Sequence, residues 1–190
     1  MAKKTSKRKT LNILDKNKKH SQFDYTECFR HIRTNIEFST VDKDIKSICI
    51  TSSQAGEAKT TLSINLAYIF ATKYNRVLLI DCDLRKNTLH KYMGLSNKHG
   101  LTDALLEYRQ TKKLNVEYFQ SVNDPSFAGT MAVLTSGIHI PNPSESLLLN
   151  NPFFAYKNRL ILFIGNKYKI VCVPVLIKPF VIYKIINNFF

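Results

Sequence analysis

The chain has 190 residues, which is enough for one domain with a proper hydrophobic core and too short for an expectation of two. Its formal net charge of +14 comes from the two ends, because residues 1–20 carry +7, residues 151–190 carry +6 and residues 21–150 carry only +1. This nearly neutral central region argues against a nucleic-acid-binding domain, whose basic residues normally lie on the folded surface.

The first 22 residues are rich in lysine and contain few large apolar side chains, a composition that predicts a disordered basic arm. Such an arm is either a solvated tail or a polybasic segment that contacts anionic lipid on the cytoplasmic leaflet. Nothing in its sequence favours one interpretation over the other.

A helix is predicted over residues 25–38, where apolar residues recur at spacings of four, three and four. On its polar side three charged residues, Glu27, Arg30 and Arg33, are spaced three apart. This row can form an internal ion pair, contact a neighbouring subunit or simply face solvent.

A phosphate-binding turn is predicted between an apolar strand at 47–51 and a helix over about 60–73. A Lys-Thr pair that opens a helix directly after a strand is typical of a P-loop, in which backbone N–H groups and the helix N-terminus face an anion. The lysine then reaches the outer phosphates and the hydroxyl binds Mg²⁺. Lys59 and Thr60 fit these two roles.

The turn departs from the regular P-loop pattern G-x-x-x-x-G-K-[ST], because Ser53 and Ala58 stand where its two glycines belong and only Gly56 remains. If the residue before the lysine requires a positive φ, alanine there costs about 1–2 kcal/mol. If it does not, the change is mild. An ordinary strand-to-helix turn is the alternative interpretation of this segment.

A second strand is predicted at 76–80, whose nearly continuous apolar run is typical of a parallel strand covered on both faces. Strand, helix and strand form a parallel crossover, so Asp81 and Asp83 should lie at the same sheet edge as Lys59. Two carboxylates beside a phosphate indicate Mg²⁺, and Arg85 adds a cation that phosphoryl transfer can use to offset charge.

The next segments continue the alternation of strand and helix that is typical of a parallel sheet. They are a short helix at 101–108, a strand at 131–134, a turn at Pro141-Asn142-Pro143, and a helix that starts at Ser144-Glu145.

Five motifs occur along the chain in a fixed order: Glu27-x-x-Arg30-x-x-Arg33 with Thr34 to Phe38, Thr51 to Thr61, Leu78 to Lys86, Gly100 to Leu105, and Pro141 to Glu145. Over residues 22–146 the chain thereby resembles the bacterial protein-tyrosine kinases (BY-kinases) of capsule and exopolysaccharide gene clusters. The resemblance implies an α/β fold of the P-loop NTPase type, a parallel sheet with flanking helices that is incomplete at the C-terminus.

The implied reaction transfers the γ-phosphoryl group of ATP to tyrosine, on an adjacent copy of the chain and on sugar-processing proteins. By this resemblance Lys59 holds the β- and γ-phosphates, Thr60 and Asp81 serve Mg²⁺, and Asp83 takes the tyrosine proton. Arg85 completes the implied catalytic set. The implied nucleotide-binding residues are Gly56, Glu57, Ala58, Lys59, Thr60 and Thr61.

The resemblance also implies partners. Glu27, Arg30 and Arg33 match an oligomerisation helix, and a separate membrane-anchored activator is expected, so the protein itself would be cytoplasmic. No secretory signal is present and the four cysteines lack metal-ligand spacing, which agrees with this location. Partition and septum-placement ATPases share the fold but carry a second lysine where this chain has Gln54, which disfavours that alternative.

The C-terminal segment 147–190 departs from the family, which continues with a helix and a strand ending in Ile-Ile-Asp-Thr-Pro-Pro. No Asp or Glu follows Glu145, so the aspartate that completes the Mg²⁺ site is missing. Asn, Phe, Tyr, Lys and Ile supply 26 of the 40 residues in 151–190, which suggests a frameshift near residue 146. A membrane span is disfavoured, because lysines and prolines interrupt every apolar run.

Three segments are therefore expected: a basic arm (1–22), a partial P-loop kinase domain (23–146) and an aberrant tail (147–190). A sheet that has lost its later strands should be unstable and prone to aggregate. The sequence leaves two functions open: an active tyrosine kinase, or a catalytically inactive relative that binds kinase subunits or the membrane activator.

Overall fold

The structure is a computed structural model that describes residues 25–39, 47–52, 55–111, 113, 115–139, 159–165 and 170–171. The predicted basic arm, the turn at 141–143 and the helix that starts at Ser144 lie outside the described residues. So do Ser53 and Gln54 in the phosphate turn.

The described chain alternates helices and strands. The helices are α1 (Tyr25–Phe38), α2 (Lys59–Ala71), α3 (Leu89–Met93), α4 (Leu101–Thr111) and the 3-10 helix η1 (Val116–Tyr118). The strands are β1 (Ser47–Thr51), β2 (Arg76–Ile80), β3 (Phe119–Val122), β4 (Thr130–Leu134), β5 (Arg159–Gly165) and β6 (Ile170–Val171). The predictions for α1, α2, α4, β1, β2 and β4 are confirmed, with shifts of up to three residues at element ends; α3, η1 and the other strands were not predicted.

The strands form one sheet in the order β1-β5-β2-β4-β3, with β6 paired to β5. β2 and β4 are parallel neighbours, as expected for a strand covered on both faces. The sheet is nevertheless mixed, because β3 runs antiparallel to β4 and β5 runs antiparallel to both β1 and β2. The α/β class of the P-loop type is confirmed, and the departure from a parallel sheet comes from the strands that the sequence patterns did not indicate.

β5 occupies the slot between β1 and β2, inside the tail that was expected to be aberrant. Its register places residue 162 opposite Ile48 on one side and opposite Leu79 on the other. The strands β1 and β2, which precede the phosphate turn and follow α2, therefore do not pair with each other directly. The tail supplies β5, the strand between them, so the sheet is continuous from β1 to β2 although it was expected to lack its later strands.

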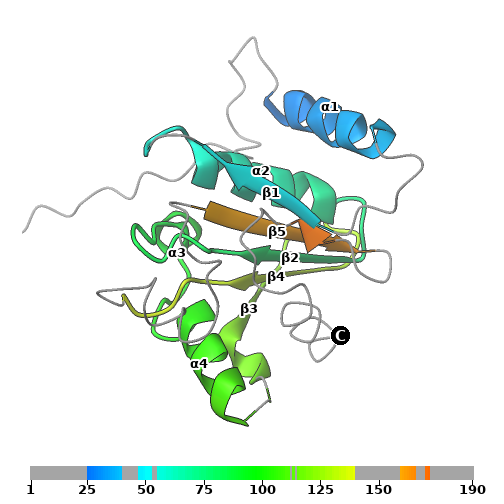
Figure 1. The fold of residues 1–190 in the computed structure, drawn as a ribbon. Helices are drawn as coiled ribbons and strands as arrows, with labels where there is room; N and C mark the ends of the chain where they lie inside the picture. The colour runs from blue at the N-terminus through cyan, green and yellow to red at the C-terminus, as the bar shows by residue number, and fades with distance from the viewer. Residues whose placement is uncertain are drawn as a thin grey trace, which may run out of the picture.

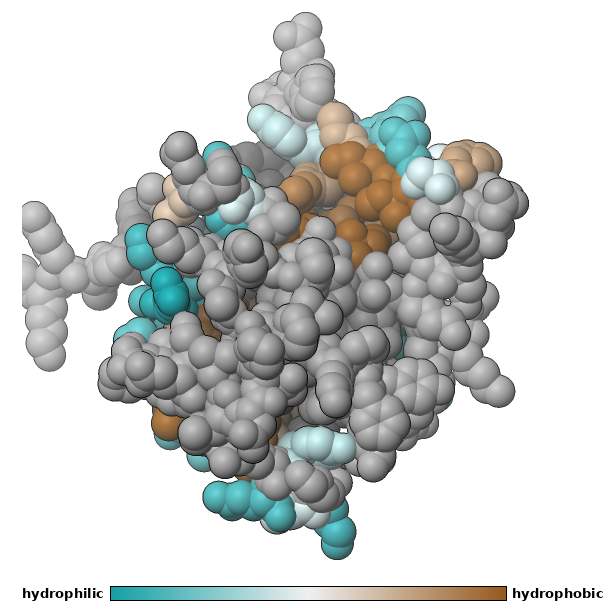
Figure 2. Space-filling view, in the orientation of Figure 1, coloured by the Kyte–Doolittle hydropathy of each residue, from teal (hydrophilic) through white to brown (hydrophobic). Residues whose placement is uncertain are grey.

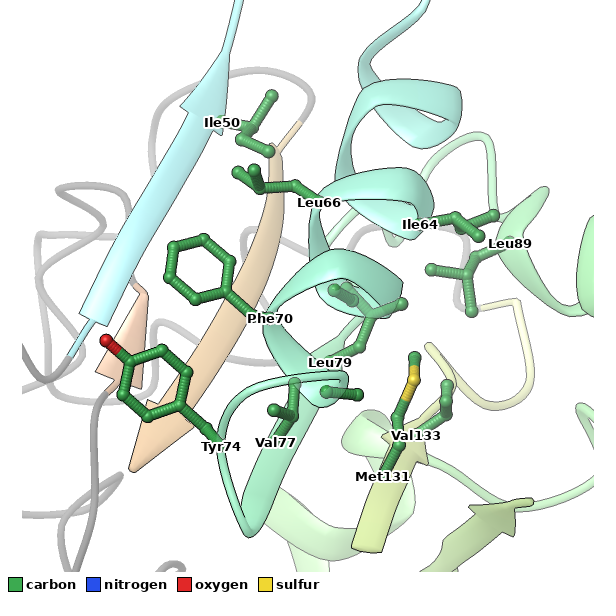
Figure 3. Close-up of a cluster of buried hydrophobic side chains, with 12 residues drawn as sticks. Ile50, Ile64, Leu66, Phe70, Tyr74, Val77, Leu79, Leu89, Met131 and Val133 are labelled. Carbon is green, nitrogen blue, oxygen red and sulfur yellow. The ribbon is translucent and has the colours of Figure 1, made fainter. Parts of the chain in front are cut away.

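The main hydrophobic core lies between α2 and one face of the sheet (Figure 3). Alternate residues of a strand face the same side, so Val77 and Leu79 of β2 pack with Met131 and Val133 of β4. Helix α2 contributes Phe70 among others to the same cluster, and eight of its thirteen residues are buried. A helix buried on so much of its surface needs a second covering layer, and α1 provides it.

α1 packs on the outside of α2 and not directly on the sheet (Figure 1). None of its residues is fully buried, and Tyr25, Ile32 and Phe38 are exposed. Figure 2 shows hydrophobic surface in the upper part of the view, where α1 meets α2. The apolar stripe predicted for this helix is therefore only partly covered.

Candidate nucleotide-binding site

The turn between β1 and α2 has the backbone form of a phosphate-binding loop. Gly56 has φ 89° and Ala58 has φ 55°, both in the left-handed region. Ala58 precedes the first residue of α2 and supplies no side-chain cap to the helix. The N-cap residue therefore does not cap the first N–H groups of α2, and a helix N-terminus of this kind favours an anion.

Ala58 is strained, which answers the question that the sequence left open. It is the only residue other than glycine with positive φ among the described residues. A left-handed conformation costs an L-residue with a Cβ about 1–2 kcal/mol. Backbone strain of this kind persists where surrounding structure enforces it, and it is concentrated at binding loops.

Lys59, the first residue of α2, bends back across the turn. Its Nζ donates a hydrogen bond to Oγ of Ser52, the residue that follows β1. Its side chain and that of Thr60 are half-buried, whereas Glu57 is exposed. The positive charge of Lys59 thus lies over the turn, where an outer phosphate would bind.

Asp81 is buried at the end of β2, with 1% of its surface exposed. Its backbone N–H donates to the Leu134 carbonyl oxygen at 2.9 Å, which extends the β2–β4 ladder by one residue. Oδ1 accepts a hydrogen bond of 3.0 Å from the Asp83 backbone N–H. Oδ2 has no hydrogen-bond partner among the described residues.

Burial raises the pKa of Asp81 to about 7, and the negative charge of Asp83 also raises it, whereas backbone hydrogen bonding by Asp83 and Leu89 acts in the opposite direction. A buried carboxylate oxygen without a partner is costly unless a cation or a proton accompanies it. Mg²⁺ is usually held by one or two carboxylates together with substrate phosphates, so Asp81 and Thr60 fit such a site. No group of three His, Cys, Asp or Glu side chains in the described segments could hold a metal ion by itself.

Asp83 shapes the turn that we call the acidic loop (residues 81–87). Its Oδ1 accepts hydrogen bonds from the backbone N–H groups of Lys86 at 2.8 Å and Arg85 at 3.3 Å. Asp83 is half-buried and Arg85 is exposed. One carboxylate oxygen of Asp83 is therefore engaged in holding the loop.

The register of β5 shows that the two turns share one edge of the sheet. Thr51, the last residue of β1, lies opposite residue 159, and Ile80, the last residue of β2, lies opposite residue 161. The strand ends that lead to Lys59 and to Asp81 are thus separated by one strand at the same edge, as predicted. The neighbouring position 159 is an arginine, and the chain has no acidic residue after Glu145.

The charged row of α1 divides into two environments. Glu27 and Arg30 form an exposed ion pair with a 3.0 Å separation. Arg33 is turned inward, because its Nη1 donates to the Ile69 carbonyl oxygen at 2.8 Å and its side chain is only 15% exposed. The role of the three residues in oligomerisation remains a prediction.

Sequence patterns did not indicate two further polar residues at this edge, Asn87 and Asn97. Both donate side-chain hydrogen bonds to the Gly137 carbonyl oxygen beyond the end of β4. A single asparagine in a loop is typical of any turn, so only its spatial neighbours distinguish these two.

No helix in the described part of the chain is long and apolar enough to cross a membrane.

Residues 45–175 match the family described as AAA domain, a range that runs from β1 to β6. The chain is 46% identical over 122 residues to tyrosine-protein kinase YwqD of Bacillus subtilis, which covers 64% of this chain and 48% of that protein. It is 35% identical over 161 residues to the putative tyrosine-protein kinase CapB of Staphylococcus aureus, covering 85% and 65% respectively. The chain therefore spans about half to two-thirds of the length of these relatives.

Solved structures give the same result. The chimerical protein CapA2B2 matches with a TM-score of 0.54 and 36% identity, over 66% of this chain and 51% of that one. The kinase domain of the Escherichia coli tyrosine kinase ETK matches with a TM-score of 0.51 and 32% identity, over 64% and 45%. The predicted resemblance to bacterial tyrosine kinases is confirmed, and together with the P-loop these similarities indicate a nucleotide-binding domain.

Proposed function

Because the chain belongs to the AAA domain family, we propose that it is an ATP-dependent protein-tyrosine kinase that regulates capsular or exopolysaccharide biosynthesis. The proposal is supported by relatives that are named tyrosine-protein kinases, and by the two turns, which follow strand ends at one edge of the sheet. The observation that carries it is the buried Asp81, whose Oδ2 has no hydrogen-bond partner among the described residues.

In this proposal the phosphate turn binds the nucleotide. The backbone N–H groups from Gly56 to Thr61 surround the phosphates, and the left-handed residues Gly56 and Ala58 turn the chain toward them. Lys59 leaves Ser52 for the β- and γ-phosphates, where its ammonium group offsets negative charge. Thr60 supplies a hydroxyl ligand for the metal ion.

The acidic loop provides the remaining chemistry. Mg²⁺, when bound, neutralises the charge that develops on the transferring phosphoryl group. Asp81 loses its proton to accept the ion or its waters. Asp83 accepts the proton of the substrate tyrosine through the oxygen that does not cap the loop, and Arg85 adds positive charge beside the phosphates.

Partners follow from the same proposal. A membrane-anchored activator would bring the cytoplasmic kinase to the membrane, and self-association would present tyrosines of one copy to the site of another. The exposed Glu27–Arg30 pair and the uncovered apolar residues of α1 offer a contact surface for a second copy.

We also retain the division into a basic arm at 1–22, a kinase domain at 23–146 and a tail at 147–190.

The experiment incubates the chain with the activator segment, Mg²⁺ and γ-labelled ATP, beside a Lys59→Met variant. Label on tyrosine that depends on Lys59 is the expected result. No label, with binding to the activator retained, would overturn the kinase proposal and support a catalytically inactive binding protein. A Lys73→Met variant is a matched control, because Lys73 lies at the opposite end of α2, where it pairs with Glu37 at 2.7 Å.

A further inference from the structure

Gly137, which lies just beyond the end of β4, is hydrogen-bonded by two asparagine side chains. Asn97 Nδ2 donates to the Gly137 carbonyl oxygen at 2.6 Å, and the Gly137 N–H donates to Asn97 Oδ1 at 3.1 Å. The side-chain amide of Asn97 thus bonds both backbone polar groups of Gly137. Asn87 Nδ2 donates to the same carbonyl oxygen at 3.3 Å.

The packing around Gly137 fixes its place. Gly137 is buried with φ 84°, and a Cβ added there would lie 2.7 Å from Asp103 Oδ2. A Cβ on Gly100 would lie 2.3 Å from both the Gly137 nitrogen and the Thr135 oxygen. Asp103 Oδ2 also accepts the Gly100 N–H at 2.9 Å. Two backbone segments can approach this closely only because both residues are glycine.

The acidic loop is anchored to this fixed point. At its start, the Asp81 N–H donates to the Leu134 carbonyl oxygen on β4. At its end, Asn87 donates to the Gly137 carbonyl oxygen three residues further along the same segment. Between these anchors Asp83 organises the loop: its Oδ1 accepts hydrogen bonds from the N–H groups of Arg85 and Lys86, and its own N–H donates to Asp81 Oδ1. Both ends of the loop are therefore tied to one strand and its exit.

We propose that Asn87 and Asn97 are positioning residues, which act through Gly137 to hold the acidic loop in the geometry that places Asp81 and Asp83 at the nucleotide edge. Asn87 ties the loop to Gly137, and Asn97 keeps the Gly137 carbonyl in place to receive it. The inference rests on the proposed function for its effect on Mg²⁺ and ATP, but the tether itself is a property of the chain without ligand.

The first test measures the affinity of a fluorescent ATP analogue in Mg²⁺ and in EDTA, for the full chain and for Asn87→Ala and Asn97→Asp. The aspartate keeps the acceptor for Gly137 N–H and removes the donor. In each variant the ratio of the affinity in Mg²⁺ to the affinity in EDTA should be about two- to tenfold smaller, which is the effect of losing one hydrogen bond. The affinity in EDTA itself should not change. An unchanged Mg²⁺ gain would overturn the proposal. Asn123→Ala, an exposed asparagine after β3, is the matched control.

The second test needs no nucleotide and separates this inference from the proposed function. Hydrogen exchange should show the Arg85 and Lys86 amides exchanging about tenfold faster in Asn87→Ala, with β2 and β4 amides unchanged. Equal exchange rates in the loop would overturn the tether, and faster exchange throughout the sheet would mean that Asn87 only stabilises the fold. Local loosening in a chain that binds no nucleotide would keep the tether and reject the proposed function.

Discussion

Arg33 Nη1 donates a hydrogen bond of 2.8 Å to the backbone carbonyl oxygen of Ile69, near the end of α2. The last carbonyl groups of a helix lack backbone partners within the helix and carry partial negative charge. The Thr72 hydroxyl also donates to the Ile69 oxygen at 2.8 Å, and the Arg33 guanidinium adds a charged cap. This contact joins α1 to α2, since Glu37 on α1 also accepts hydrogen bonds from Lys73 and Tyr74 beyond the end of α2.

Replacement of Arg33 by alanine should therefore lower the free energy of unfolding by about 1–2 kcal/mol, because a part-buried charged hydrogen bond and its neighbours are lost. Urea unfolding measures this change. Arg30→Ala is the control, since its ion pair with Glu27 is exposed and should contribute less than about 1 kcal/mol. Equal effects of the two substitutions would contradict the capping role of Arg33.

Ala58→Gly should stabilise the chain by about 1 kcal/mol, because glycine adopts φ 55° without the penalty that alanine carries. The urea midpoint should rise, with nucleotide affinity maintained or improved. Ala55→Gly serves as the matched control in the same turn, since Ala55 does not have positive φ and gains nothing from the change. A midpoint that falls in Ala58→Gly would show that the turn relaxes in solution.

Asp81 should make stability fall as the pH rises. Its pKa is raised to about 7 from an ordinary value near 3.8, so between these values the unfolded chain releases a proton that the folded chain retains. The free energy of unfolding then decreases from about pH 4 to pH 7 and levels off above.

Asp81→Asn removes this contribution, so in EDTA the variant should be more stable than the parent near pH 7.5 and equal to it near pH 4. Urea unfolding at several pH values measures the difference in the free energy of unfolding between the variant and the parent. The contributions of the other titrating groups are the same in both chains and cancel in this difference. The variant should also lose the gain in nucleotide affinity that Mg²⁺ provides. A difference between the two chains that does not change with pH would argue against a raised pKa at Asp81.

A proline at position 162 tests the central place of β5, because it removes a backbone N–H from a strand that has a neighbour on each side. Leu162→Pro should abolish cooperative unfolding or lower the melting temperature by about 6–12 °C, which corresponds to a loss on the order of 3 kcal/mol. Leu162→Ala keeps the N–H group and separates the backbone effect from the loss of the side chain. Similar melting of the two variants would mean that β5 is not a central strand.

Periodicity and motif order were sufficient for the parts of the fold that depend on local sequence. The apolar spacing of α1, the continuous run of β2 and the Lys59–Thr60 pair after β1 all correspond to the elements in the structure. The shared sheet edge of the two turns was predictable as well, because strand, helix and strand impose a common strand direction.

Other features depend on contacts between distant segments and had no local signal. Helical spacing indicated that Arg33 shares a face with Glu27 and Arg30, but it could not show that Arg33 reaches Ile69. The sign of φ at Ala58 depends on how β1 and α2 are joined. β5 was missed because its pairing is non-local, and its composition suggested an aberrant tail.

The position of β5 also determines the order in which the sheet can form during synthesis. β2, β4 and β3 can pair once residue 134 has emerged from the ribosome, but β1, made earlier, has no described neighbour other than β5. The backbone hydrogen bonds between β1 and β5 can form only after residues 159–165 have been synthesised, more than a hundred positions later. A nascent chain with an unpaired strand for so long is exposed to aggregation. Chaperone capture of ribosome-bound chains should therefore be strongest between the completion of β4 and that of β5.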